Sequence, residues 1–152
     1  MIALNSKAPD FDLEGSDGKR HKLSEFRGKY LVIYFYPKDD TPGCTVEACG
    51  FRDSNAEIKK LGAEVVGISK DGLESHGKFK DKYSLNFLLL SDPDNKTIKA
   101  YDAYGDKGIF GWGTLRKTYV IDKKGNVVMI YPKVHPEGHN KEVIEFLKNS
   151  KS

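Results

Sequence analysis

The only two cysteines of the 152-residue chain lie five positions apart, at Cys44 and Cys49. They follow a polar loop, KDDTPG (38–43), and that loop follows an apolar run ending at Tyr36. The thiolate is the reactive form of cysteine, and a free thiol with a pKa near ~8.5 is mostly protonated at neutral pH. A helix beginning at Cys44 would place unpaired N–H groups and the positive end of its dipole beside the sulfur. The pattern therefore predicts a reactive thiol in the first turn of a helix.

Three residues near Cys44 suit such a thiol. Pro37 ends the apolar run and supplies apolar cover without an N–H group. Thr41, three residues before the sulfur, carries a hydroxyl that can donate and accept a hydrogen bond. Gly43 has no side chain, so backbone N–H groups can approach a bound oxygen there. The loop is suited to hold oxygen atoms beside the sulfur.

The spacing of the cysteines alone leaves other interpretations open. Two small buried hydrophobic residues would explain them equally well. Two cysteines are too few for a disulfide-stapled secreted fold, and no second Cys or His pair stands at zinc-site spacing. His135 and His139 are four apart, but they lie in a Pro/Gly loop rather than on a helix face. We expect neither a metal nor a cofactor.

The elements that must position the loop follow from hydrophobic periodicity. Residues 31–36 are apolar on both faces, which suits a strand at the centre of a sheet covered by helices. A hairpin within residues 8–23 precedes this strand. The pattern then predicts, in order, a helix at 46–61, a strand at 65–68, a helix at 73–83, a strand at 87–90, a helix at 95–104, a loop at 105–113, strands at 118–121 and 127–131, and a closing helix after 139.

This order predicts the fold class. Strands that alternate with helices, followed by a hairpin and a helix, indicate an α/β domain with a mixed sheet. The layout resembles the thioredoxin-like fold, with a central mixed β-sheet flanked by helices and an N-terminal hairpin extension. We expect one domain over residues 1–152.

Within the 46–61 helix, Val46, Cys49 and Phe51 are expected to share one side. Gly50 weakens this helix by about 1 kcal/mol relative to alanine, directly after the second cysteine. His76 lies on the apolar stripe of the 73–83 helix but is expected at the surface or an edge.

Other residues allow more than one interpretation. His21, like His76, is expected at the surface or an edge. Phe110 and Trp112 lie in the glycine-rich loop and could anchor it, wall a pocket or form a partner surface.

The composition excludes several classes of function. Hydrophobic residues make up 38% and charged residues 31% of the chain, and the formal net charge is +3. The charges are interspersed without a basic stripe, so we expect no nucleic-acid partner. The longest apolar run is far shorter than the roughly 20 residues of a membrane helix. The first residues lack a basic segment followed by an apolar core, so we expect a cytoplasmic protein without membrane association.

Pro37-x-x-x-Thr41-x-x-Cys44 resembles the active-site motif of the peroxiredoxins, and TPGCTVEAC (41–49) resembles their bacterioferritin-comigratory, or peroxiredoxin Q, branch. The similarity covers nearly the whole chain and includes APDF (8–11), LSEFRGK (23–29) and RKTYVID (116–122). It implies a thiol peroxidase in which Cys44 attacks the O–O bond of hydrogen peroxide or an organic hydroperoxide and becomes a sulfenic acid.

The resemblance also implies roles for the residues around the sulfur. Thr41 and the backbone N–H groups of Gly43 and Cys44 would hold the peroxide oxygens. Arg116 would stabilise the thiolate and the developing charge. Glu47, one turn after the cysteine, would hold that arginine in place. A guanidinium supplies charge and several donors in one plane, which a lysine does not.

For Cys49 the resemblance implies the role of resolving cysteine. It would attack the sulfenic acid, give an intrachain Cys44–Cys49 disulfide, and leave that bond for thioredoxin or a similar dithiol protein to reduce. A resolving cysteine in the same chain removes the chemical need for a dimer, so we expect a monomer.

Helix geometry adds a requirement of its own. Positions five apart on an intact helix have Cα atoms about 8.6 Å apart, whereas a disulfide needs roughly 7 Å or less. We therefore predict that the first helical turns unwind in each cycle, within a segment bracketed by Gly43 and Gly50.

Two rival functions use the same cysteine pair. A thiol–disulfide oxidoreductase would share the fold, but its usual motif has two residues between the cysteines, and here there are four. A non-enzymatic redox sensor or chaperone-like partner protein would react with peroxide once and not turn over.

Overall fold

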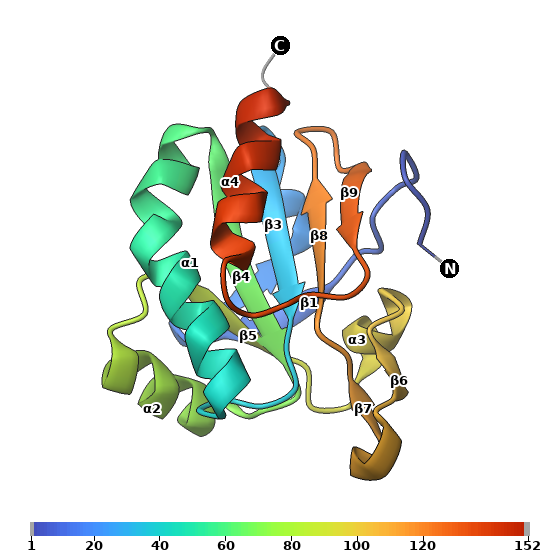
Figure 1. Cartoon of the computed structure of the whole chain (residues 1–152). Coiled ribbons are helices and arrows are strands. Elements are labelled where there is room, and N and C mark those ends of the chain that lie inside the picture. Colours follow the sequence, from blue (N-terminus) through green and yellow to red (C-terminus); the bar gives the residue numbers. More distant parts are fainter. Residues whose placement is uncertain (1, 151–152) are drawn as a thin grey trace.

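The computed structural model describes residues 2–150. A mixed seven-stranded sheet with the order β2-β1-β5-β4-β3-β8-β9 forms the centre of the fold (Figure 1). Its strands are β1 (Asp12–Gly15), β2 (Arg20–Lys22), β3 (Tyr30–Phe35), β4 (Ala63–Ser69), β5 (Leu88–Ser91), β8 (Lys117–Ile121) and β9 (Val127–Tyr131). The predicted mixed sheet is confirmed, and so is the N-terminal hairpin, in which β1 and β2 pair antiparallel.

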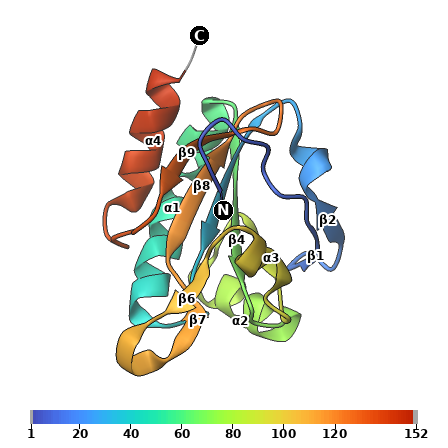
Figure 2. The same ribbon diagram turned by 90° about the vertical axis from the view of Figure 1, so that its right-hand side faces the viewer.

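Helices cover both faces of this sheet. They are α1 (Pro42–Lys60), α2 (Leu73–Tyr83), α3 (Lys96–Ala100) and α4 (His139–Asn149). The helices α1 and α4 lie side by side on one face, and α3 lies on the other together with the N-terminal segment (Figures 1 and 2). The sheet therefore has a hydrophobic core on each side.

The central strand β3 leads directly into the cysteine loop. It pairs parallel with β4 and antiparallel with β8, and all but its first residue are buried. Alternate side chains enter different cores. The core under α1, α2 and α4 receives Val32, Tyr34 and Tyr36. The core under α3 receives Leu31, Ile33 and Phe35. The prediction of a strand buried on both faces is confirmed, and this burial fixes the point from which the loop starts.

The segment predicted as a loop at 105–113 is instead a hairpin. The strands β6 (Tyr104–Asp106) and β7 (Trp112–Thr114) pair antiparallel, with Gly105 opposite Gly113, and the hairpin projects from the body of the domain (Figure 2). The predicted helix at 95–104 is shorter than expected: α3 ends at Ala100, Asp102 has a positive φ of 56°, and Tyr104 already belongs to β6. Glycines hide the alternating pattern that would have indicated strands.

The buried side of α1 differs from the predicted one. Phe51 is buried as expected, but Val46 is 47% exposed. The buried stripe instead starts at Cys44 and continues through Glu47 and Ala48 at helical spacing. Glu47 is a charged residue at a buried position, which the hydrophobic pattern does not predict.

His76 is fully buried, so its predicted surface position is wrong. Its two ring nitrogens lie 2.7 Å from Asp39 Oδ2 and 2.9 Å from the Leu90 carbonyl oxygen, and these bonds make burial of the ring possible. His21 lies on the edge strand β2, as expected, with its ring between the carboxylates of Asp17 and Glu25.

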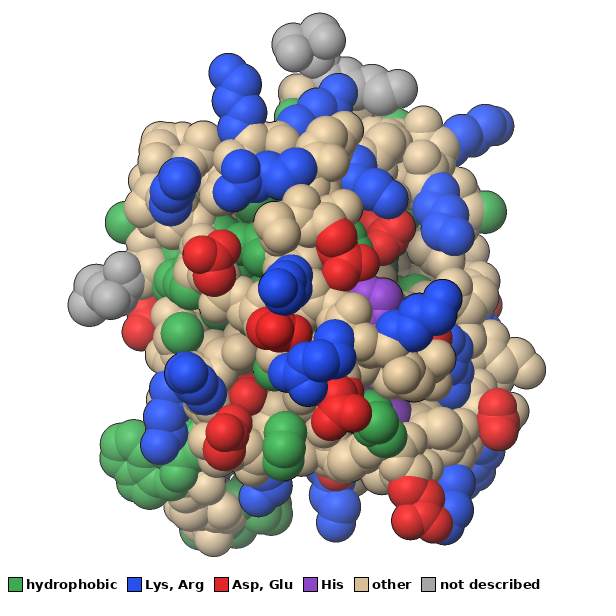
Figure 3. Space-filling view, turned by 180° about the vertical axis from the view of Figure 1, so that it is seen from behind, with side chains coloured by type: hydrophobic (Ala, Val, Ile, Leu, Met, Phe, Trp, Pro, Cys, Tyr) green, Lys and Arg blue, Asp and Glu red, His purple; other side chains and the backbone are tan. Residues whose placement is uncertain are grey.

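The surface is charged and mixed, with one apolar projection. Blue and red side chains alternate over the face in Figure 3, and hydrophobic side chains gather at its lower left, where the β6–β7 hairpin projects. The exposed fractions there are 96% for Ile109, 78% for Phe110 and 67% for Trp112. Within residues 2–150, no helix combines the length and the hydrophobicity needed to cross a lipid bilayer.

Candidate active site

Cys44 lies in the first turn of α1 and is only 1% exposed. The helix begins at Pro42, where a proline is favoured because the first helical N–H needs no intrahelical partner. Thr41 precedes it in an extended conformation, with φ −99° and ψ 156°. The thiol therefore sits beside the unpaired N–H groups of a helix N-terminus, as the sequence predicts.

A guanidinium links the sulfur to a buried carboxylate. Arg116 donates through Nη2 to Cys44 Sγ at 3.5 Å and through Nη1 to Glu47 Oε1 at 2.8 Å. Arg116 stands directly before β8, the strand that pairs with β3, so the sheet brings it across from the other end of the chain. The guanidinium therefore places positive charge directly beside the sulfur.

The carboxyl group of Glu47 is unusual because it is fully buried, next to Arg116. Burial raises its pKa from 4.5 to about 7, and the charge and hydrogen bond of Arg116 only partly oppose that rise. Its second oxygen, Oε2, has no hydrogen-bond partner among residues 2–150. Burial acts to lower the pKa of Arg116, but Cys44 and Glu47 together raise it. The net effect is a raised pKa, so the arginine stays charged.

Gly43 is the point where the arginine packs against the helix. A Cβ atom at this position would lie 3.0 Å from Arg116 Nη2 and 3.5 Å from Pro136 Cγ. The missing side chain thus makes room for the guanidinium, a reason that the sequence did not reveal. Pro136 comes from the loop between β9 and α4, and no motif pointed to it.

The other two residues of the motif lie on the loop itself. Thr41 donates its hydroxyl hydrogen to the Lys38 carbonyl oxygen at 2.9 Å. Within residues 2–150 it makes no hydrogen bond to Cys44, so the structure brings Arg116 to the sulfur but leaves the Thr41 hydroxyl bonded to its own loop. Pro37 is half-buried just after β3.

Cys49 lies further along α1, which is continuous from Pro42 to Lys60, and it is partly exposed. Both thiols are free. The next residue, Gly50, packs against α4, where a Cβ would lie 3.0 Å from Asn140 Oδ1. Asn140 in turn donates to Ser54 Oγ at 2.8 Å. Gly50 is therefore a packing position as well as a weak point of the helix.

His135 and His139, the two histidines considered as metal ligands, lie in different environments. His135 is exposed in the loop before α4. His139 is fully buried at the start of α4, 2.8 Å from Thr118 Oγ1 and 3.1 Å from Glu142 Oε1. Burial lowers the pKa of His139, against the effect of Glu142. Among the described residues, no three His, Cys, Asp or Glu side chains form a metal-binding group.

A mixed α/β fold that buries a thiol at a helix N-terminus against an arginine is the design of a thiol-based redox enzyme. Residues 4–130 match the model of the AhpC/TSA family. The chain belongs to that family, and within it to the peroxiredoxins of the bacterioferritin-comigratory, or peroxiredoxin Q, branch. It is thus a peroxidase of the antioxidant kind, acting on peroxides.

Relatives and solved structures agree with this placement. The chain is 46% identical over 151 residues to "Peroxiredoxin Bcp" of Bacillus subtilis, covering 97% of this chain and 96% of the relative. A crystal structure of a variant of Xylella fastidiosa peroxiredoxin Q superposes with a TM-score of 0.94 at 30% identity, over 98% of this chain and 97% of that one. This likeness confirms the predicted thioredoxin-like fold class.

A third similar structure carries information on substrate. It is the bacterioferritin comigratory protein of Xanthomonas campestris, with a TM-score of 0.87 at 37% identity, over 91% of this chain and 90% of that one. Its description refers to alkyl peroxide reduction activity and to trapped intermediate and ligand complexes.

Proposed function

We propose that Cys44 is the residue that reduces the peroxide. Its thiolate sulfur attacks one oxygen of the O–O bond, an S–O bond forms, and the O–O bond breaks. The leaving oxygen takes up a proton and departs as water or an alcohol, and Cys44 is oxidised to a sulfenic acid. The contact between Arg116 Nη2 and Cys44 Sγ at 3.5 Å is the observation that carries this proposal.

Arg116 would act in both the resting and the reacting state. It stabilises the thiolate before reaction and the charge that moves onto the leaving oxygen during it. Glu47 holds one end of the guanidinium at 2.8 Å, so the other end stays directed at the sulfur. A lysine in this position would supply one nitrogen where the arginine supplies two.

The peroxide would bind at the N-terminus of α1. The backbone N–H groups of Gly43 and Cys44 have no intrahelical acceptors there and are free to bind an oxygen. The Thr41 hydroxyl adds a polar contact, and Pro37 supplies apolar cover. We propose hydrogen peroxide and organic hydroperoxides as substrates, and the alkyl peroxide activity named for the Xanthomonas relative supports the second class.

We propose that Cys49 resolves the sulfenic acid. Its thiol attacks Cys44 Sγ, an S–S bond forms, and the sulfenic oxygen leaves as water. The two Cα atoms of an intact helix are about 8.6 Å apart at this spacing, so the turns between Gly43 and Gly50 must unwind. The disulfide then takes two electrons from thioredoxin or a similar dithiol protein.

The setting of this cycle is part of the proposal. A resolving cysteine within the chain supports a monomer, and one peroxiredoxin domain over residues 1–152 would be sufficient for the reaction. A disulfide that must be returned to thiols in each cycle supports a reducing compartment such as the cytoplasm.

Mass spectrometry of the peroxide-treated protein tests the cycle. One equivalent of peroxide should give an intrachain link between the peptides carrying Cys44 and Cys49. Stopped-flow measurements with a recycling dithiol should show many turnovers, whereas a sensor would stop after one. Insulin reduction without peroxide consumption would instead favour a thiol–disulfide oxidoreductase.

A further inference from the structure

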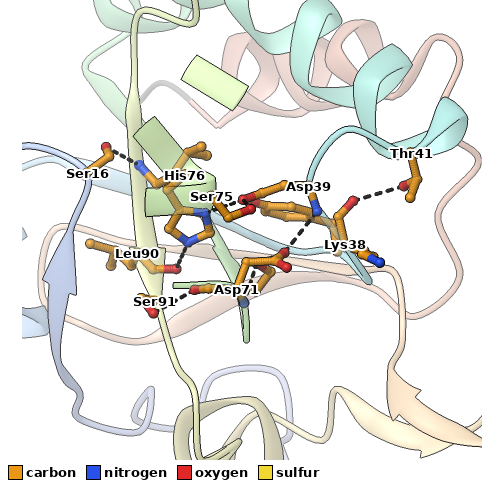
Figure 4. A network of polar contacts seen from close by, with 12 residues as sticks. Ser16, Lys38, Asp39, Thr41, Asp71, Ser75, His76, Leu90 and Ser91 are labelled. Atoms are coloured by element: carbon orange, nitrogen blue, oxygen red, sulfur yellow. Dashed lines mark hydrogen bonds and ion pairs between the residues drawn. The ribbon is translucent and has the colours of Figure 1, made fainter. Parts of the chain in front are cut away.

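The loop between β3 and α1 is tied to the rest of the domain by a buried polar network (Figure 4). Its members come from the loop itself, from the segment between β4 and α2, from α2 and from β5. The proposed peroxide chemistry uses none of them. One member, Asp39, is nevertheless only two residues before Thr41. The network is therefore a candidate for a role in the reaction.

Asp39 is the centre of the network and is almost fully buried. Its carboxylate receives Tyr36 OH at 2.6 Å, Ser75 Oγ at 2.8 Å and His76 Nδ1 at 2.7 Å. Both oxygens of this buried carboxyl group therefore have hydrogen-bond partners, as a buried polar group requires. The loop is therefore fixed at Asp39 to both β3 and α2.

The imidazole ring of His76 belongs to this network, and both of its nitrogens face oxygen. Nε2 lies 2.9 Å from the Leu90 carbonyl, which can only accept, so Nε2 carries a hydrogen. Nδ1 faces the Asp39 carboxylate, so a proton lies between these two groups as well. The ring thus joins α2 and β5 to the loop through two bonds.

Asp71 holds the neighbouring backbone. Its Oδ2 accepts the Asp39 N–H at 2.9 Å and the Ser69 hydroxyl at 2.7 Å. The peptide group between Lys38 and Asp39 is therefore fixed at its N–H side. The carbonyl of this same peptide accepts the Thr41 hydroxyl at 2.9 Å.

We propose that Asp71 and the Asp39–His76 pair are positioning residues for Thr41 in peroxide reduction. The peptide plane transmits their position, since a carbonyl cannot turn while its N–H is held. With its hydrogen given to Lys38, the Thr41 oxygen keeps only lone pairs for the site. It then accepts a hydrogen bond from the peroxide O–H, which orients the O–O bond for attack by the sulfur. This inference rests on the proposed role of Cys44.

The first experiment separates positioning from folding. In Asp71→Ala the acceptor of the Asp39 N–H is lost, and the rate of Cys44 oxidation by hydrogen peroxide should fall about tenfold. Alkylation of Cys44 by iodoacetamide needs no Thr41 hydroxyl and should change by less than about twofold. Asp71→Asn keeps an amide oxygen in place and should recover most of the peroxide rate.

A matched control comes from the exposed side of the same loop. Lys82 donates to Asp40 at 2.8 Å, an ion pair between α2 and the loop in which both side chains are well exposed. Exposed pairs of this kind contribute little. Lys82→Ala should leave both rates unchanged.

The second experiment is a double-mutant cycle with Thr41→Val, which removes the hydroxyl. If Asp71 acts through that hydroxyl, Asp71→Ala should cause no further loss of peroxide rate in the Thr41→Val background. His76→Leu should behave like Asp71→Ala; should it not fold, the partly exposed Asp71 still decides the question.

Two results would overturn the inference. One is an equal fall of the peroxide and alkylation rates in Asp71→Ala, which would show a purely structural role. The other is a loss that adds fully to that of Thr41→Val. Failure of the proposed function is a separate result, because peroxide reduction would then persist in Cys44→Ser whatever the Asp71 variants do.

Discussion

The two cysteines share one helix but differ in burial and in hydrogen bonding. Cys44 is buried in the first turn of α1 and receives a hydrogen bond from Arg116. Cys49 is partly exposed, and within the described part of the chain no hydrogen bond from a cationic side chain reaches it. Neither the residue type nor the helix makes the difference. It comes from helix position and from one residue that the sheet brings from far along the chain.

The comparison also separates two tasks. A nucleophile that meets a small peroxide works best in a shielded site with fixed donors, and burial provides both. A thiol that must reach a second sulfur, and leave a disulfide open to an external dithiol, benefits from exposure.

Cys44→Ser should have the largest effect. Peroxide consumption with excess dithiothreitol should fall by about a thousandfold or more, because the remaining thiol lacks the arginine and the helix N-terminus. Substantial activity in this variant would mean that Cys49, not Cys44, is the nucleophile.

Arg116→Lys tests what distinguishes the two thiols. The rate of Cys44 oxidation should fall between about a hundredfold and a thousandfold, since one ammonium cannot contact both the sulfur and Glu47. Stopped-flow kinetics under single turnover measures this rate. Arg20→Lys, at an exposed ion pair with Asp12, is the matched control and should have no effect. A change of less than about threefold in Arg116→Lys would mean that burial alone distinguishes Cys44.

Glu47→Gln tests the buried carboxylate through pH. The folded protein holds a proton on Glu47 up to a pKa of about 7, while the unfolded chain loses it near 4.5. The free energy of unfolding should therefore fall as pH rises between these values, by roughly 2 to 3 kcal/mol from this group. Urea unfolding at pH 5, 6, 7 and 8 measures the slope. The glutamine variant should lose this part of the fall, and an unchanged slope would contradict the shift.

Cys49→Ser should have the smallest effect on the first step. Oxidation of Cys44 should stay within about twofold of the wild type, because Cys49 makes no contact with the reacting sulfur in the helical state. The sulfenic acid should accumulate and be trapped by dimedone, visible as a mass increase, while recycling by thioredoxin becomes slow. Normal recycling would show that Cys49 is not the resolving residue.

Much of this arrangement could be predicted from the sequence because its determinants are local. A run of apolar residues, a loop with prolines and a helical pattern define β3, the loop and α1 in order. The position of Cys44 at a helix start follows from these neighbours alone. Arg116 needed the family resemblance, since nothing in its own surroundings in the sequence indicates that it faces the sulfur.

What could not be predicted depends on contacts across the fold. In the sequence, His76 is a polar residue on a predicted helix. Its burial depends on hydrogen bonds to Asp39, from a distant loop, and to the Leu90 carbonyl. Glu47 interrupts an apolar stripe because its partner lies on another element. The β6–β7 hairpin has Gly105 opposite Gly113 at its middle pair, which interrupts the side-chain alternation that would have indicated strands.

The exposed hairpin has a spectroscopic consequence. Trp112 is the only tryptophan in the chain, and it stands in water on β7, four residues before Arg116. Its emission should start near the long-wavelength limit of a hydrated indole. Any protein that covers the hairpin would shift the emission to shorter wavelength and reduce its quenching by iodide. The chain therefore carries a built-in fluorophore for contacts at this surface, without the need for a label.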